Sequence, residues 1–148
     1  MIKKCLAALV LGTSLLTGCV ALDASESGYL VDREHQPAAS ALYAVISDTV
    51  AEMGKICSPA RTQIALSYSA DTDPFTSKFV SALRSAGFAV SEPETGKQAG
   101  GNFRYTLDSQ PDGIRMTVHV NGMRLSRAYT MTGSSMSHWT VMRPQDGR

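Results

Sequence analysis

The sequence contains no block of lysine or arginine and no large excess of one charge, because 14 Lys and Arg stand against 13 Asp and Glu. A nucleic-acid-binding protein needs a clustered basic surface, so we expect no direct contact with DNA or RNA. Long apolar runs are missing too, except at the extreme N-terminus. The chain has 148 residues and is 43% hydrophobic, which leaves room for one domain or two small ones and argues against wholesale disorder.

Familiar catalytic and metal-binding motifs are also missing. The sequence has no HExxH, CxxC, Gly-x-Ser-x-Gly, GxGxxG or P-loop pattern. Its three histidines, His35, His119 and His138, are too scattered to predict a metal site. The Gly100-Gly101 pair indicates a loop hinge rather than a phosphate cradle. We therefore expect no enzyme activity, no catalytic residue, no metal and no small-molecule substrate.

What the sequence does contain is an N-terminal export signal. Two lysines lie within Met1–Lys4, and the stretch from Cys5 to Thr17 has no charged residue. A charged segment followed by an apolar one is typical of a secretory signal. The apolar stretch is too short to span a membrane, which takes roughly 20 apolar residues. Residues 1–18 are therefore interpreted as a signal peptide that is cleaved off.

The end of this signal resembles the bacterial lipobox. A leucine and two small residues, Leu16, Thr17 and Gly18, lie directly before Cys19. The resemblance implies recognition by a signal peptidase at these residues and a covalent diacylglycerol and N-acyl chain on Cys19. We expect no other cofactor. Two or more acyl chains hold a protein stably to a membrane without a spanning helix. The alternative is an ordinary signal peptide with a chance cysteine near its end.

The residue after Cys19 indicates which membrane holds the anchor. In Gram-negative lipoproteins, retention in the inner membrane usually goes with an aspartate at this position, whereas here the residue is Val20. The resemblance therefore implies the outer membrane, with the protein facing the periplasm.

Cys57 would be the only free thiol of the exported protein, since Cys5 leaves with the signal and Cys19 is acylated. An odd cysteine in an oxidising compartment leaves three alternatives: burial in the fold, a disulfide with a partner protein, or a surface thiol.

The mature chain divides into a tether, a helix and a compact domain. Residues 19–36 have no sustained period and are interpreted as a lipidated, flexible tether. Within them Tyr29–Val31 is a short apolar patch, which can pack on the protein's own domain or add a strand to a partner's sheet.

An amphipathic helix is expected over residues 37–57, because apolar residues recur there at spacings of three and four. The stripe consists of Leu42, Val45, Ile46, Thr49, Met53 and Ile56. Pro37 suits the first turn, and Gly54 with Ser58-Pro59 is expected to end the helix.

A strand-helix-strand unit is expected next. Alternation over 62–69 predicts a strand, Asp73 and Pro74 are typical of a helix start, and Gly87 is placed for a left-handed cap before a strand at 88–90. A right-handed crossover makes the two strands parallel.

An antiparallel meander follows. Alternating segments predict strands over 103–108, 114–120, 123–129 and 138–142. Asn121-Gly122 predicts a tight type I′ turn. Residues 61–142 are therefore expected to form an α+β domain: a small mixed sheet with one or two helices packed on one face, followed by a tail at 143–148.

The C-terminal third is rich in arginine. Residues 101–148 contain six arginines, no lysine and three aspartates. Because arginine prefers planar, bidentate partners, Arg104, Arg115, Arg124 and Arg127 are candidates for a face that meets carboxylates on another protein. The alternative is a solvated strand face.

The order of these parts, a lipobox followed by a short tether, a helix and a small α+β domain, resembles the TrbH family of conjugal transfer lipoproteins. The resemblance implies a structural subunit of the mating-pair formation apparatus, a type IV secretion system that carries plasmid DNA between cells. It implies other core subunits as partners, and by analogy with small lipoproteins of Vir-type systems it makes Cys57 a candidate for a partner disulfide. The alternative is an envelope lipoprotein that binds a small ligand or peptidoglycan, supported by the same four arginines.

Overall fold

The computed structural model describes residues 28–30, 36–67, 69–70, 73–95, 97 and 99–144. The expected signal peptide, the lipobox and Cys19 lie outside these residues. The helices are α1 (Ala39–Ile56), the short 3-10 helix η2 (Pro59–Arg61) and α2 (Pro74–Ser85). The strands are β1 (Gly28–Leu30), β2 (Gln63–Ala65), β3 (Ala89–Ser91), β4 (Phe103–Gln110), β5 (Gly113–Val120), β6 (Met123–Tyr129) and β7 (Thr140–Met142).

The described strands form two sheets. The main sheet has the order β1-β4-β5-β6-β7, in which β4 to β7 are the antiparallel meander and β1 is parallel to β4. The parallel pair β2-β3 is a separate small sheet, joined to the main one by a bridge between Leu66 and Phe103. The α+β class and the parallel strand-helix-strand unit are confirmed. That unit's strands contribute a second sheet rather than part of one mixed sheet.

Strand β1 lies within the segment interpreted as a tether. Its three residues pair with Thr106–Asp108 of β4, so this part of the segment belongs to the main sheet. Of the two alternatives for the patch at 29–31, the structure shows pairing with the protein's own domain for Tyr29 and Leu30, and Val31 lies outside the described residues.

Helix α1 follows the predicted apolar stripe. Its buried residues are Ala41, Val45, Ile46, Thr49, Val50 and Met53, and Leu42 and Ile56 are partly buried. Gly54 does not end the helix, which runs on to Ile56. The next residue, Cys57, donates its backbone N–H to the Met53 carbonyl at 2.7 Å. Packing of Met53 and Cys57 in the core outweighs the weak helix propensity of one exposed glycine.

Helix α2 begins and ends as its sequence predicts. The Asp73 side chain accepts a hydrogen bond from the Thr76 N–H at 2.8 Å, and Pro74 occupies the first helical position. At the other end Gly87 has a φ of 90°, the left-handed conformation that glycine adopts without strain. The Asn121-Gly122 turn likewise has positive φ at both residues, as a type I′ hairpin requires.

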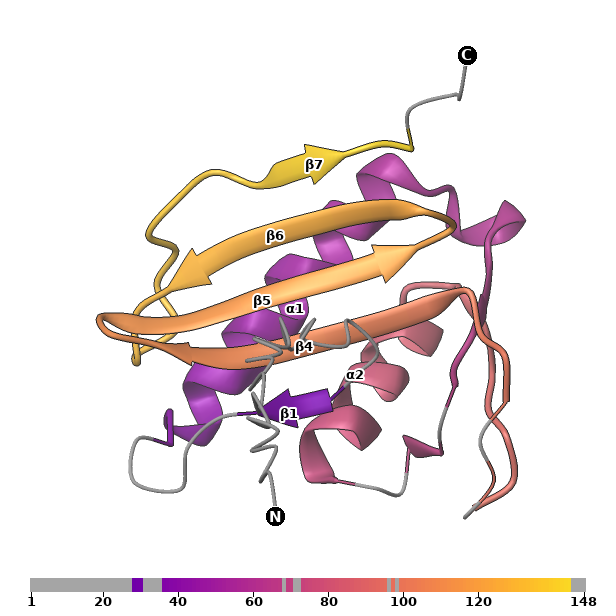
Figure 1. Cartoon of the computed structure of the whole chain (residues 1–148), viewed down its shortest axis with the longest axis horizontal. Helices are drawn as coiled ribbons and strands as arrows, with labels where there is room; N and C mark the ends of the chain where they lie inside the picture. Colours follow the sequence, from indigo (N-terminus) through magenta and orange to yellow (C-terminus); the bar gives the residue numbers. More distant parts are fainter. Residues whose placement is uncertain are drawn as a thin grey trace, which may run out of the picture.

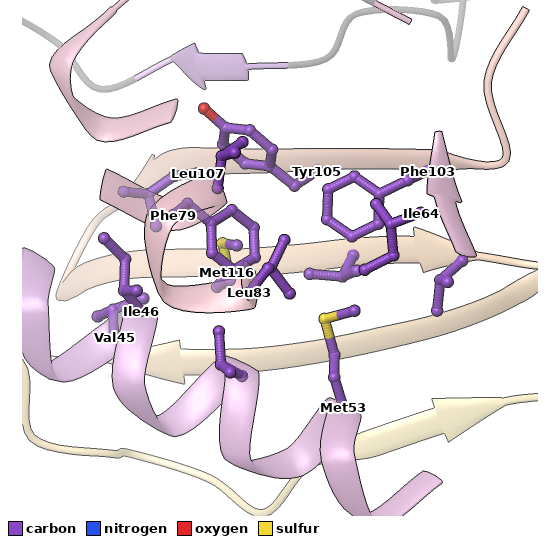
Figure 2. Packing of buried hydrophobic residues seen from close by; sticks show 14 of the residues in the cluster. Val45, Ile46, Met53, Ile64, Phe79, Leu83, Phe103, Tyr105, Leu107 and Met116 are labelled. Atoms are coloured by element: carbon purple, nitrogen blue, oxygen red, sulfur yellow. The ribbon is translucent and has the colours of Figure 1, made fainter. Parts of the chain in front are cut away.

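Both helices pack on one face of the main sheet (Figure 1). The face buries Phe103, Tyr105 and Leu107 of β4, Ile114, Met116, Val118 and Val120 of β5, and Leu125 and Tyr129 of β6. Phe79 of α2 packs beside Phe103 and Tyr105 of this face (Figure 2). The ring centroids of Phe79 and Tyr105 are 5.3 Å apart in an edge-on arrangement, a favourable geometry for aromatic pairs.

A polar network fastens α1 to β6. Oδ2 of Asp48 on α1 accepts hydrogen bonds from Nη1 of Arg127 at 2.8 Å and from the Tyr129 hydroxyl at 2.7 Å. Arg127 also donates from Nε to the Ser137 carbonyl at 2.8 Å, and it lies over the rings of Tyr129 and Trp139. Burial, together with the hydrogen bond to Asp48, raises the pKa of Tyr129, so its hydroxyl stays a donor.

We expect Asp48→Ala to lower the free energy of unfolding by about 1–2 kcal/mol, because it leaves a mostly buried guanidinium and hydroxyl without their acceptor. The matched control is Glu52→Ala on the same helix, which removes an ion pair with the exposed Lys55 and should cost less than about 0.5 kcal/mol. Urea denaturation monitored by circular dichroism measures both. Equal losses in the two variants would contradict the proposed role of Asp48.

Candidate functional site

The outer face of the main sheet, the side turned away from α1 and α2, is polar. It carries Arg104, Thr106 and Asp108 of β4, Arg115, Thr117 and His119 of β5, Arg124, Ser126 and Ala128 of β6, and Thr140 and Met142 of β7. Alternation along each strand puts these residues here, because successive side chains of a strand point to opposite faces. Three of the four predicted arginines therefore share one surface.

A row of basic side chains crosses three neighbouring strands of the outer face. His119 on β5 lies directly opposite Arg104 on β4 and opposite Arg124 on β6. Partial burial lowers the pKa of His119, and the positive charges of Arg104 and Arg124 lower it further. The histidine is therefore held neutral at pH 7, between two permanent cations.

Among the described residues of the outer face, Asp108 on β4 is the acidic one, and it lies opposite Arg115 on β5. Partial burial raises the pKa of Asp108, while Arg115 and a hydrogen bond donated by Gln110 pull it down in part.

An open depression of about 400 Å³ lies where β6 meets β7. Its lining residues are Arg115, Arg124, Ser126, Arg127, Ala128, Ser137, Thr140 and Met142. Three arginines and three hydroxyls thus line this space. The guanidinium of Arg127 is bound by Asp48, which leaves Arg115 and Arg124 to meet a ligand that bears carboxylates.

Arg127 differs from the other three predicted arginines. Arg127 lies two residues from both Leu125 and Tyr129 on β6, so its side chain points to the same face as theirs, toward α1. There it pairs with Asp48. Although Arg127 also lines the depression, its guanidinium is already bonded to Asp48 and to the Ser137 carbonyl, so it is less available to a ligand than Arg115 and Arg124.

Cys57 lies in the core with 6% of its surface exposed, and burial raises the pKa of its thiol. The structure therefore matches the burial alternative, and the partner disulfide stays a prediction. Sequence reasoning did not select Asp48, Ser126, Ser137 or Thr140. The alternation of β6 contained the signal for Ser126, whereas Asp48 and Ser137 come from segments that only the fold brings to β6.

In the part of the chain that the structure describes, no three His, Cys, Asp or Glu side chains lie close enough together to hold a metal ion. Over the same residues neither helix has the length and apolarity to cross a membrane.

The fold and the outer face define a small α+β domain whose sheet buries one face under helices and presents a basic, hydroxyl-rich surface on the other. A family model described as "Conjugal transfer protein TrbH" matches residues 25–144. The chain therefore belongs to the TrbH family of conjugal transfer proteins, as the order of its parts predicted. Comparison with curated proteins and with solved structures gave no match.

We expect Arg124→Gln to raise the pKa of His119 toward its usual value, because one of the two flanking charges is removed. The increase is partial, since burial still disfavours the charged ring. Titration of the His119 ring protons by NMR measures it. Arg61→Gln, at an exposed arginine on η2, is the control and should leave the titration unchanged. Identical curves for Arg124→Gln and the wild type would contradict this electrostatic account.

We expect the Cys57 thiol to react with a disulfide reagent only after unfolding. A full-length Cys5→Ser/Cys19→Ser variant keeps Cys57 as its single thiol. A buried thiol with a raised pKa presents little thiolate, so absorbance after addition of Ellman's reagent should rise slowly in buffer and fully in urea. Fast reaction in buffer, or a reductant-sensitive band on gels of native membranes that disappears with Cys57→Ser, would favour the partner disulfide instead.

Proposed function

We propose that this protein is an outer-membrane lipoprotein, anchored through Cys19 and facing the periplasm, that serves as a structural and assembly subunit of a conjugative type IV secretion apparatus. The observation that carries the proposal is the TrbH family match over residues 25–144. The lipobox at Leu16–Cys19 lies outside that range, so it is an independent argument for the anchor.

The fold supports a role close to the membrane surface. Strand β1 begins at Gly28, nine residues after Cys19. A fully extended chain advances roughly 3.3–3.6 Å per residue, so the domain would stay within about 30 Å of the lipid anchor. On this proposal the anchor supplies the location, and the domain supplies a rigid surface for the other subunits.

A second candidate is an envelope lipoprotein that binds a small ligand or peptidoglycan. The depression lined by Arg115 and Arg124 favours it, because the peptides of the cell wall carry carboxylates.

We expect Cys19→Ala to move the protein out of the outer-membrane fraction and to reduce plasmid transfer, because the acyl chains would be lost. Fractionation, incorporation of labelled palmitate and mating frequency measure these effects. Cys5→Ala is the matched control, since Cys5 would be removed with the signal. Wild-type fractionation and mating of Cys19→Ala would overturn the anchor.

Pull-down of the full-length protein from native membranes after gentle detergent extraction separates the two functions. Recovery of other transfer-apparatus subunits supports assembly. Recovery of wall fragments without those subunits supports the binding lipoprotein.

A further inference from the structure

The outer face carries two exposed cations whose charge is balanced only in part inside the described part of the chain. Arg115 and Arg124 form no ion pair there, whereas Arg84 pairs with Glu92 and Arg127 pairs with Asp48. Asp108 opposite Arg115 offsets part of the charge, and its pKa is raised by burial. The surface around the depression therefore favours an anionic partner.

The spacing of the two arginines is set by strand register. Arg115 lies opposite Ala128, which is four residues after Arg124 on β6. At 3.2–3.4 Å per strand residue, the two backbone positions are about 13 Å apart along the sheet. An extended peptide covers the same length in four residues, and residues i and i+4 of such a peptide point to the same side.

The space between the arginines suits a peptide rather than a bare ion. Hydroxyls of Ser126, Ser137 and Thr140 line the depression and can bond to backbone groups. Met142 is 57% exposed at its rim and offers an apolar contact beside the charges. Methionine is adaptable in shape, so it tolerates different apolar partners.

We propose that this depression binds an extended acidic segment of a partner protein, with two carboxylates four residues apart that meet Arg124 and Arg115 while an apolar side chain packs on Met142. This deepens the proposed function, and rests on it only in placing the partner among periplasmic subunits of the apparatus.

The test uses the full-length protein in a neutral detergent and a synthetic Thr/Val peptide with glutamates at positions i and i+4. Isothermal titration calorimetry should detect binding that weakens as salt is added, because exposed charges are screened. Two control peptides carry glutamine in place of glutamate, or glutamates at i and i+3, which point to opposite sides. Both should bind more weakly.

Arg115→Gln and Arg124→Gln should each weaken binding of the i, i+4 peptide about fivefold to tenfold, as expected for a charge-assisted contact at a partly exposed site. The control Arg61→Gln should bind as the wild type does. Because Arg115 and Arg124 are exposed, the thermal unfolding midpoints of the two variants should stay near the wild-type value. This measurement separates a loss of binding from a loss of folding.

Equal binding of the glutamate and glutamine peptides, or unchanged binding by both arginine variants, would overturn the proposal. Binding to vesicles containing phosphatidylglycerol that needs both arginines, with no peptide binding, would overturn it in favour of a lipid surface. The assay requires neither an anchor nor plasmid transfer. A failure here therefore leaves the proposed function standing, and loss of the anchor role leaves this result standing.

Discussion

The whole arrangement depends on burying one face of the antiparallel meander under two helices. Side chains of a strand alternate between the faces of a sheet, so a slip of one residue would expose Phe103, Tyr105 and Leu107 and push arginines into the core. Register is therefore specified strongly by the difference between the two faces. The tight turn at Asn121-Gly122 holds the same register at the hairpin, since its backbone twist matches that of the strands.

Among the described residues, the inner face of the sheet has one charged side chain, and a carboxylate of the helix packed on it compensates that charge. Arg127 turns toward α1, where Asp48 accepts its hydrogen bond at 2.8 Å. A buried guanidinium without a carboxylate would be costly, so the pair also constrains which residue of α1 can lie over β6. Tyr129 adds a second hydrogen bond to the same carboxylate, so two side chains of β6 hold Asp48 of α1.

The two faces of the main sheet differ in chemistry and in exposure to solvent. The inner face supplies stability, because its apolar side chains leave water when α1 and α2 pack on it. The outer face keeps its long polar side chains, including Arg115 and Arg124, exposed next to a depression. Residues of the outer face can therefore vary without disturbing the core.

The sequence by itself determined the local features, because each depends on neighbouring residues: the apolar stripe of α1, the Asp73 cap of α2, the Asn121-Gly122 turn and the alternation of the meander. Strand alternation likewise places Arg104, Arg115 and Arg124 on one face of the sheet. Only the tertiary structure decided that residues 28–30 join β4, that Cys57 is buried and that Asp48 of α1 meets Arg127 of β6. Those outcomes depend on which distant segments meet, and the energies of such contacts arise from packing that no local spacing in the chain encodes.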